Sequence, residues 1–422
     1  MRKKILLHGP VLTRSGYGEQ ARFALRALRE HENLYDIYVH PINWGATSWI
    51  QEDNAEHTWI DSLCHKTRDY EQTVDGKYDI SIQVTIPNEF KNMADINIGY
   101  TAGIETTKVA PVWLEACNHM DKVIVVSNHS KEVFLNTVYK ATSPETGQEV
   151  ILKNKTPISV VNYPVRSKNK EKDFELNLDY DFNFLAIAQF GPRKNLPNTI
   201  AWFMQEFKDE EVGLVLKTSM AKNCLMDKNH TEVSLKQIMS NFKDSKCKVY
   251  LLHGNMSEEE LSALYQHEKI KAFVSIAHGE GYGLPIFEAA HYGLPVIAPA
   301  WSGQNDFLFV PQKDKKTGKV KTRPMFSRVE YTVAPVQKEA VWDGVVQKDS
   351  MWCYPEESSF KEQMRNVKES YKKAETRAKK LKKYLTENFT EEIMYDNFIE
   401  ALQLDSSSPA QEKDDSQKIV ML

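Results

Sequence analysis

Short apolar runs alternate with amphipathic stretches along the first 165 residues of the chain. The apolar runs have the length of buried strands, and the amphipathic stretches have the spacing of helices. Strands are predicted at residues 4–7, 35–39, 78–84, 96–100, 122–126 and 158–161, and helices at residues 18–29, 111–118 and 130–138. Such an alternation is typical of a parallel sheet that helices cover on both faces.

The same alternation restarts after a polar stretch at residues 166–177. Residues 356–402 have a helical pattern with a break near Asn388. Further strands are predicted at residues 184–189, 213–217, 249–252, 272–276 and 295–298, and further helices at residues 196–207, 258–267 and 284–292. Two blocks of this kind with a polar joint predict an α/β protein that consists of two doubly wound, Rossmann-like domains.

Composition and charge exclude several classes of protein. A net charge of −4 argues against a chain that is basic overall, as a general nucleic-acid binder would be. No apolar run approaches the ~18 residues of a membrane span, and the N-terminus lacks the apolar core of a signal peptide. The 5 scattered cysteines have neither a disulfide nor a zinc spacing. We therefore expect reduced thiols and a cytoplasmic protein.

The first motif with candidate chemistry is GYGEQA at residues 16–21, after a predicted strand and at the start of a helix. It fits the G-x-G-x-x-G/A pattern of dinucleotide-binding loops, in which glycine lets a phosphate approach a helix N-terminus. A nicotinamide site also needs an acidic residue at the end of the second strand, but that strand ends at His40 and Asp36 lies at its beginning. We therefore favour a phosphate- or sugar-facing loop at Gly16 and Gly18, with a tight turn as the structural alternative.

The strongest signal is SIAHGEGYGLPIFEAA at residues 275–290, where a strand ends, a glycine-rich turn follows and a helix begins. Glu280 lies on the turn at the carboxyl end of the strand, where doubly wound sheets bind ligands. Glu288 lies about one turn into the helix. The backbone donors expected to grip an anion or a sugar are those of Gly281, Tyr282, Gly283 and Leu284.

Here the chain resembles the retaining nucleotide-sugar glycosyltransferases of the family-4 type, the glycosyl transferases group 1. Their hallmark is a Glu-x7-Glu motif in the context EGFGLPxxEAMAxGxPVI, which residues 280–297 follow nearly position by position. The resemblance spans the chain from Gly16 to about residue 310. It implies a sugar contact for Glu280 and a contact to the ribose hydroxyls for Glu288.

Residues 188–195, AQFGPRKN, look like the diphosphate-binding GRLxPRKG segment of the same family. Arg193 and Lys194 match its basic pair, and two cations facing a cleft would neutralise a leaving diphosphate. Gln189 departs from the family pattern, which commonly has arginine there, so we expect diphosphate binding to depend on Lys194, with Lys217 as a further candidate. An exposed pair of cations at a helix entry is the structural alternative.

Residues 99–107, GYTAGIETT, with PVW at 111–113 and DKVIVVS at 121–127, are similar to the family's first-domain run E-T…P-x-W…D-x-V-x-V-x-S. The resemblance would place Glu105 in the cleft, where a carboxylate could stabilise positive charge on the sugar or orient the acceptor. A salt-bridge glutamate is the structural alternative. Asp306 is a weaker candidate for a residue near the donor.

No metal site is predicted. The D-x-D sequence at residues 179–181 is interpreted as solvated linker charge, and no His, Cys or carboxylate cluster has metal-ligand spacing. Residues 365–383 are strongly basic, which usually indicates a solvated helix face. An anionic partner for that helix, phospholipid or nucleic acid, is the alternative.

The family's architecture, the GT-B type, implies two facing doubly wound domains with a cleft between them and C-terminal helices that cross back onto the first domain. We expect an N-terminal acceptor-side domain at residues 1–165, a linker at 166–182, a donor domain at 183–385, a helix packing back at 386–404 and a disordered tail at 405–422.

The resemblance implies that a sugar moves from a nucleotide-sugar donor to an acceptor with retention of the anomeric configuration, without a metal or another cofactor. The sequence leaves open the donor's sugar and base, the oligomeric state and the acceptor, which could be a glycan, a lipid, a protein or a modified DNA base. A nucleotide-sugar 2-epimerase of the same fold and a donor-binding scaffold without activity are the alternatives. The candidate catalytic residues are Glu280 and Glu105, and the candidate donor-binding residues are Gly16, Gly18, Arg193, Lys194, Lys217, Gly281, Tyr282, Gly283, Leu284 and Glu288.

Overall fold

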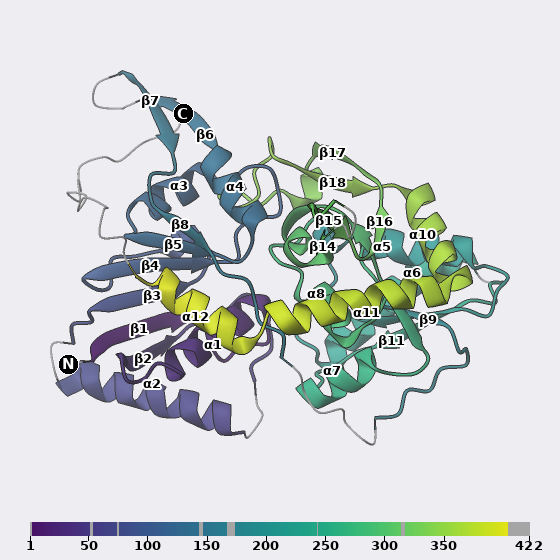
Figure 1. Cartoon of the computed structure of the whole chain (residues 1–422), viewed down its shortest axis with the longest axis horizontal. Coiled ribbons are helices and arrows are strands. Elements are labelled where there is room, and N and C mark those ends of the chain that lie inside the picture. The colour runs from purple at the N-terminus through teal and green to yellow at the C-terminus, as the bar shows by residue number, and fades with distance from the viewer. Residues whose placement is uncertain are drawn as a thin grey trace. The chain divides into compact units, whose positions relative to one another are not determined.

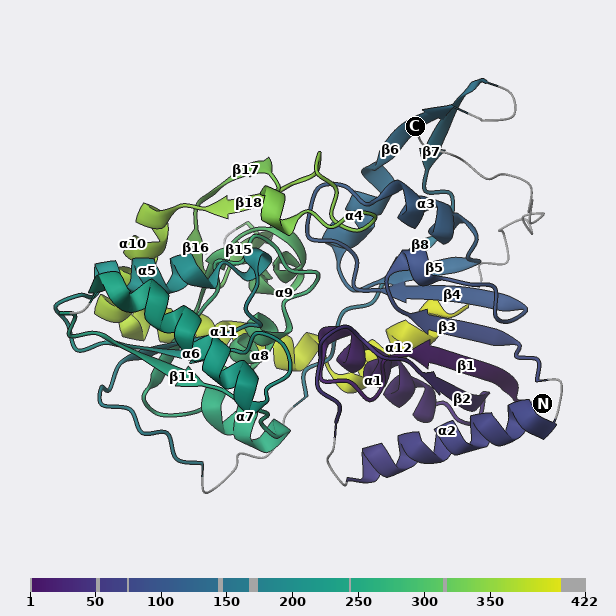
Figure 2. The ribbon, with the colours of Figure 1, turned by 180° about the vertical axis from the view of Figure 1, so that it is seen from behind.

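The computed structural model describes residues 2–50, 54–73, 76–142, 147–166, 174–242, 244–313 and 317–403 (Figures 1 and 2). The chain forms two compact units. Unit 1 comprises Met1–Tyr163, Pro335–Met351 and Glu392–Leu422, and unit 2 comprises Pro164–Ala334 and Trp352–Glu391. Each unit is built around one six-stranded sheet, which confirms the predicted α/β class with two doubly wound domains.

The sheet of unit 1 is parallel throughout and has the strand order β2-β1-β3-β4-β5-β8. Its strands are nearly continuous apolar runs because helices cover both faces, and the central residues of β1 are fully buried. The chain leaves β1 to one side for β2 and returns to the other side for β3, so the topological switch point lies between β1 and β3. The strands are β1 (Lys3–Gly9), β2 (Tyr35–Pro41), β3 (Ile80–Val84), β4 (Ile96–Thr101), β5 (Lys122–Val125) and β8 (Ile158–Val160).

The helices and the remaining strands of unit 1 include two elements that the apolar pattern did not predict. One is the long helix α2, and the other is an antiparallel hairpin, β6 and β7, where a helix was expected to reach Val138. The helices are α1 (Gly16–Arg29), α2 (Ala55–Thr73), α3 (Pro111–Asn118), α4 (Asn128–Asn136) and α12 (Glu391–Ala401), with 3₁₀ turns η1 (Pro87–Glu89) and η5 (Lys338–Ala340); the hairpin strands are β6 (Val138–Thr142) and β7 (Glu149–Lys153).

The C-terminal helix α12 packs on unit 1, beside α1 (Figure 1). The Phe23 ring of α1 lies 5.7 Å from the ring of Tyr395 and 5.5 Å from that of Phe398. Aromatic pairs at such separations contribute beyond their buried area. The helix that crosses back begins at Glu391 rather than at the expected residue 386, because α11 continues to Asn388. The expected tail at 405–422 lies outside the described residues.

The sheet of unit 2 is also parallel, with the order β11-β10-β9-β12-β13-β16. Its switch point lies between β9 and β12, which are neighbours in the sheet although two strands separate them along the chain. A doubly wound sheet binds ligands at the carboxyl ends of the strands that flank this point. The strands are β9 (Asn183–Ile187), β10 (Gly213–Lys217), β11 (Lys248–Leu252), β12 (Ile270–Val274), β13 (Val296–Pro299) and β16 (Ser327–Val329).

Helices of unit 2 pack on its sheet, and Figure 2 shows α5 and α6 side by side. α5 contacts α6 and α10, while α8 contacts α7 and α11. The helices are α5 (Leu196–Glu206), α6 (Leu225–Met239), α7 (Glu258–Tyr265), α8 (Leu284–Tyr292), α9 (Asn305–Leu308), α10 (Glu357–Glu369) and α11 (Tyr371–Asn388), with 3₁₀ turns η2 (Pro192–Lys194), η3 (Ser240–Phe242) and η4 (Ser302–Gln304). Two smaller sheets pair β14 (Phe309–Lys313) with β15 (Val320–Pro324) and β17 (Tyr331–Pro335) with β18 (Met351–Pro355).

Residues 335–351 were expected in the second domain, but in the structure they belong to unit 1. Val345 is buried in the cluster around Trp113, which forms the core between α3 and the sheet of unit 1. Lys108 and Asp349 add an ion pair at 2.5 Å. The segment therefore packs on unit 1 through apolar contacts that its own polar sequence does not reveal.

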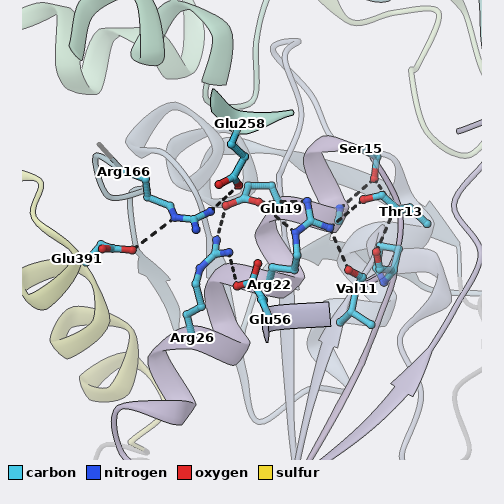
Figure 3. A network of polar contacts seen from close by, with 12 residues as sticks. Val11, Thr13, Ser15, Glu19, Arg22, Arg26, Glu56, Arg166, Glu258 and Glu391 are labelled. Atoms are coloured by element: carbon cyan, nitrogen blue, oxygen red, sulfur yellow. Dashed lines mark hydrogen bonds and ion pairs between the residues drawn. The ribbon is translucent and has the colours of Figure 1, made fainter. Parts of the chain in front are cut away.

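The expected polar linker at residues 166–182 is partly integrated into unit 2. Arg166 forms ion pairs with Glu258 at 3.1 Å and with Glu391 at 3.5 Å (Figure 3). Leu178 is buried, and Asp179 accepts a hydrogen bond from the hydroxyl of Tyr250 at 2.9 Å. Both ends of this segment are thus held by contacts within unit 2.

No helix in the part of the chain that the structure describes has the length and the apolar character needed to cross a membrane.

Stability of unit 2 is expected to fall as the pH drops below about 6.5, because His291 on α8 is buried. Burial, and then the charge of Lys382, lowers the pKa of His291 from 6.5 to about 4. The unfolded chain therefore binds a proton between these values while the folded chain does not, so stability is lost over this range, by about 2 kcal/mol for this group between pH 7 and pH 5.

His291→Gln stays neutral at every pH, so its unfolding free energy, measured in urea, should change less between pH 7 and pH 5 than that of the wild type. His230→Gln, at an exposed position of α6, is the matched control and should keep the wild-type pH dependence. An equal pH dependence in all three proteins would contradict the assignment to His291.

Candidate functional site

Glu280 lies on the loop between β12 and α8, at the switch point of the second sheet. The helix begins as the motif predicted, at Leu284, with Pro285 in its first turn. Gly283, the residue before it, has φ +94°, a conformation that favours glycine, so the sharp entry into the helix depends on this residue. In the first turn of α8, Pro285 has no N–H group, and the N–H groups of Ile286 and Phe287 donate to the carbonyl of Gly283 at 2.9 Å.

Two cations pair with the carboxylate of Glu280. Lys194 Nζ lies 2.5 Å from Oε1, and Arg193 Nη1 lies 3.1 Å from Oε2. The side chain of Glu280 is only 11% exposed and that of Arg193 is 33% exposed, so the carboxylate is largely desolvated while the cations are half-buried. Arg193 and Lys194 belong to η2, which follows β9, and β9 is the sheet neighbour of β12. The adjacency of β9 and β12 at the switch point thus brings the predicted basic pair, Arg193 and Lys194, into contact with the predicted Glu280.

The charge state of this cluster follows from its geometry. Burial raises the pKa of Glu280, but Lys194 and then Arg193 more than offset that effect and hold the pKa below 4.5. Glu280 is therefore ionised at neutral pH, and the three groups carry a net charge of one positive unit. A cluster of this kind attracts an anion while it keeps one carboxylate available to accept hydrogen bonds.

The backbone around Glu280 is fixed by the loop after β13. Glu280 N donates to Ser302 Oγ at 2.8 Å, and Gly303 N donates to the carbonyl of Glu280 at 2.9 Å. A Cβ on Gly303 would lie 2.0 Å from the carbonyl oxygen of Gly281, so this approach requires glycine. Loops from three adjacent strands, β9, β12 and β13, therefore converge on Glu280, the first on its carboxylate and the third on its backbone.

Glu288 lies on α8, within the same unit, and its Oε2 accepts a hydrogen bond from the hydroxyl of Tyr265 at 2.8 Å. Tyr265 ends α7 and is fully buried, and burial together with the charge of Glu288 holds the pKa of its hydroxyl far above 10. The hydroxyl is therefore protonated and acts as a fixed donor that orients the carboxylate.

The side chain of Tyr282 has a structural role. It is 3% exposed, and its ring lies 5.3 Å from the ring of Phe287 and 5.0 Å from that of Phe307. Only backbone groups of Tyr282 remain as candidates for ligand binding, as for Gly281, Gly283 and Leu284.

Lys217 ends β10, beside β9, but its Nζ donates to the carbonyl of Gly254 in the loop after β11. It does not belong to the Glu280 cluster. Gln189, which replaces the arginine of the family pattern, donates to the carbonyl of Met220 at 2.9 Å. Both side chains thus contact loops on the β10–β11 side of the sheet.

Sequence reasoning missed a buried pair on this side of the sheet, Asp227 on α6 and His253 after β11. His253 Nε2 lies 2.8 Å from Asp227 Oδ1. The carboxylate also accepts the backbone N–H groups of Met220 and Lys222 at 2.9 Å and that of Ala221 at 2.5 Å, and these bonds together with His253 outweigh burial and lower its pKa. The loop after β10 therefore has a fixed shape. No motif or spacing in the sequence points to this pair.

In unit 1, Gly16 and Gly18 open α1, after β1 at the switch point of the first sheet. Ser15 caps the helix by accepting a hydrogen bond from Gly18 N at 2.9 Å. A Cβ on Gly18 would lie 2.1 Å from the carbonyl oxygen of Thr13, whereas no atom lies within 4 Å of a Cβ on Gly16. Packing alone explains why residue 18 is glycine, whereas the space around Gly16 is open to a ligand.

Alanine at these two positions should have different effects. Gly18→Ala is expected to cost about 1–3 kcal/mol of unfolding free energy, because the methyl group would overlap the Thr13 backbone. Gly16→Ala should leave stability unchanged or slightly higher, since Gly16 is exposed and its φ is not positive. Urea denaturation of both variants measures this difference, and equal losses of stability would contradict it. Any loss of ligand affinity in Gly16→Ala then reports a ligand contact.

Glu105 follows β4 in unit 1 and is half-buried. The ring of His129 makes hydrogen bonds with the backbone of Thr106 and Glu105, and burial lowers the pKa of His129 to about 4. Tyr17 lies close by, with its hydroxyl 2.8 Å from Thr101 Oγ1. A neutral histidine thus fixes the loop that carries Glu105, at the carboxyl edge of the first sheet. The two candidate catalytic carboxylates lie in different units.

Among the described residues, no three or more His, Cys, Asp or Glu side chains are grouped so that they could hold a metal ion.

Comparison with known proteins relates part of unit 2 to a known family. Residues 168–318 match the family Glycosyl transferases group 1, and this range contains Glu280, Glu288 and the basic pair. The serotype-specific mannosyltransferase WbdA of Escherichia coli is 32% identical over 118 residues, which cover 27% of this chain. The chain spans only 13% and 12% of the length of the two curated WbdA proteins that it matches.

Solved structures share the fold along nearly the whole chain. Sucrose-phosphate synthase from Thermosynechococcus elongatus superposes with a TM-score of 0.59 at 13% identity, covering 94% of this chain and 98% of that one. A glycosyltransferase from Rickettsia africae gives a TM-score of 0.55 at 14% identity, covering 96% of this chain and 100% of that one. HepE of Anabaena, solved in complex with UDP and glucose, gives a TM-score of 0.54 at 12% identity, covering 95% of this chain and 99% of that one. The fold is that of GT-B glycosyltransferases. Together with the family match, this fold supports the interpretation of the chain as a GT-B glycosyltransferase.

Proposed function

We propose that this protein transfers a sugar from a nucleotide-sugar donor to an acceptor, with retention of the anomeric configuration and without a metal ion. The observation that carries the proposal is the cluster of the buried Glu280 with the half-buried cations Lys194 and Arg193 at the switch point of the second sheet. It combines the two chemistries that such a donor needs in one place: cations for the diphosphate and a fixed carboxylate for sugar hydroxyls.

The leaving group determines what the cations do. When the bond between the anomeric carbon and the diphosphate breaks, negative charge develops on the phosphate oxygen. Lys194 and Arg193, held in place before the reaction by Glu280, stabilise that charge without reorganising. The N-terminus of α8 adds the positive end of a helix dipole on the same side.

Glu280 positions the sugar in this mechanism. Its carboxylate exchanges part of its ion pairing for hydrogen bonds from sugar hydroxyls when the diphosphate takes over the cations. Glu288, oriented by Tyr265, accepts hydrogen bonds from the ribose hydroxyls. The leaving phosphate accepts the proton of the acceptor on the face of the sugar from which it departs, which retains the configuration.

Unit 1 contributes the acceptor side in this proposal. Gly16, where the backbone is open, contacts the donor, and Gly18 keeps that helix entry in shape. Glu105, at the end of β4, either stabilises positive charge on the sugar or orients the acceptor. Lys217, at the β10–β11 side of the second sheet, assists donor binding through the loop of Gly254 rather than through the Glu280 cluster.

A screen of nucleotide sugars tests the proposal. The names of the relatives mention a mannosyltransferase and a complex with UDP and glucose, so nucleotide sugars of mannose and UDP-glucose are the first donors to try. Binding is measured by titration calorimetry, slow hydrolysis by release of the nucleoside diphosphate, and transfer with pools of glycans, lipids and proteins. Transfer to an acceptor supports the proposal. Conversion of the donor alone into another nucleotide sugar would indicate an epimerase, and binding without turnover a scaffold. The absence of binding to any donor would contradict the proposal.

A further inference from the structure

A second polar pocket lies in unit 2, away from the Glu280 cluster. It has a volume of about 280 Å³ and is formed by the start of β16, the end of α10 and the start of α11 (Figure 1). This size is close to the lower end of the ~300–1,000 Å³ range of small-molecule sites. Its polar lining residues are Ser327, Gln363, Asn366, Ser370, Lys373 and Arg377.

The pocket lies at the opposite edge of the sheet from the proposed donor site. Ser327 is the first residue of β16, which runs parallel to β13, so it marks the amino ends of these strands. The Glu280 cluster lies at the carboxyl ends. A ligand in this pocket is therefore not the donor bound at that cluster.

The charge of the pocket is positive. Lys373 and Arg377 lie one helical turn apart on α11, and no carboxylate is among the residues that line the pocket. The remaining polar lining is two hydroxyls and two carboxamides, which can donate to an oxyanion or bind hydroxyl groups. The end of α10 and the start of α11 meet at Ser370, so the partial charges of the two helix ends are opposite and offset each other. The side chains therefore determine the sign of the charge in the pocket.

Arg377 is a half-buried cation, and among the described residues its guanidinium donates to a hydroxyl and a carbonyl rather than to a carboxylate. Its Nη2 donates to Ser327 Oγ at 2.8 Å and its Nη1 to the carbonyl of Phe326 at 3.4 Å. Among the described residues, none accepts a hydrogen bond from its Nε, which is buried. Burial lowers the pKa of Arg377, and no nearby carboxylate offsets the effect.

Arg365, on the preceding helix, shows how this protein normally stabilises such a group. It pairs with Glu206 at 2.8 Å and with Glu210 as well. Removing a charge from water is costly unless an opposite charge compensates it, so the half-buried guanidinium of Arg377, which lines a polar pocket that has no carboxylate, indicates an anionic partner that is not part of the chain.

We propose that this pocket binds a small soluble phosphate monoester, with Lys373 and Arg377 on the phosphate and the carboxamides and hydroxyls on a short polyol. Two cations match the charge of a phosphate monoester near neutral pH, and the fork of an arginine binds two phosphate oxygens at once. The pocket is too large for the phosphate alone, which leaves room for the organic group.

The test titrates glycerol 3-phosphate into the full chain by calorimetry, with glycerol as the neutral control. A single site is expected, and Lys373→Gln should weaken binding by about 10- to 150-fold, the effect of losing one charge-assisted contact. Lys372→Gln is the matched control, because Lys372 is the neighbouring exposed lysine of α11 and does not line the pocket. Arg377→Lys, which keeps the charge and the fold but loses the fork, should also weaken binding.

Repeating the titration in Lys194→Ala separates this site from the proposed donor site, since that variant should keep the full affinity for glycerol 3-phosphate. Three results would overturn the proposal: no binding of glycerol 3-phosphate by the wild type, equal affinities in Lys373→Gln and Lys372→Gln, or loss of binding in Lys194→Ala. Vesicles that contain phosphatidic acid form the lipid arm. If the protein binds these vesicles but not glycerol 3-phosphate, the phosphate that the pocket recognises belongs to a lipid headgroup, and the proposal of a soluble ligand is overturned.

Discussion

Glu280→Gln is expected to lower sugar transfer by about 100-fold, equivalent to about 2.7 kcal/mol of transition-state stabilisation. Glutamine keeps the volume and can still accept hydrogen bonds, but it removes the charge that positions the sugar as positive charge develops on it. Contacts that tighten in the transition state affect turnover more than ground-state binding. The measurement is the initial rate of transfer with the best donor of the screen.

The same substitution should increase the affinity for the free nucleoside diphosphate. In the structure Glu280 occupies both cations, at 2.5 Å and 3.1 Å, so a diphosphate must compete with it. Removing the competing charge, worth about 1 kcal/mol for a partly exposed pair, should tighten diphosphate binding about fivefold. Slower transfer with tighter product binding is a combination that general damage to the fold does not produce.

Glu210→Gln is the matched control for Glu280→Gln. Glu210 also lies between an arginine and a lysine, Arg365 and Lys368. This cluster is on the side of the unit where α5 and α10 pack together. It should lose a similar amount of stability and keep wild-type transfer and diphosphate affinity. Transfer by Glu280→Gln within a few-fold of the wild type would show that Glu280 does not position the sugar.

Lys194→Ala is expected to weaken diphosphate binding and transfer by about 10- to 150-fold, because it removes one charge-assisted contact to the leaving group. Arg193 alone then pairs with Glu280, so the diphosphate and the carboxylate compete for a single guanidinium. Titration calorimetry with the nucleoside diphosphate and transfer rates measure the two effects.

Lys368→Ala controls for the loss of a lysine from an Arg–Glu–Lys cluster, since Lys368 pairs with Glu210 at 2.9 Å. It should bind the diphosphate as the wild type does. If both lysine variants bind the diphosphate equally well, Lys194 is not a diphosphate ligand. Lys194→Arg should recover part of the binding, because the charge returns in a different geometry.

The fold could largely be predicted because a buried parallel strand is a continuous apolar run. The strands of the first sheet, and those of the second sheet except β16, were predicted in this way, and Gly283 and Pro285 gave the start of α8. The β6 strand was missed because Val138 continues an apolar spacing that also fits a helix, although Thr137 and Val138 are β-branched and α4 ends at Asn136. Residues 335–351 were assigned to the wrong domain because a polar segment carries no signal for the surface on which it packs.

The candidate site could be predicted only as separate pieces. The sequence indicated Glu280 and the pair Arg193 and Lys194, but not that they touch, since 86 residues separate Lys194 from Glu280 and strand order is not visible in a single chain. The adjacency of β9 and β12 brings them together. The pairing of Asp227 with His253 was missed for the same reason, as both residues are isolated in the sequence and meet only through the order of the strands.

Hydrogen–deuterium exchange with and without the best donor of the screen tests the central claim most directly, because it locates the ligand without any substitution. Donor binding should slow exchange in peptides that cover residues 188–196 and 278–290, the loops after β9 and β12 that carry the basic pair and Glu280. A donor that binds, yet leaves exchange in both segments unchanged and protects other parts of the chain instead, would contradict the account.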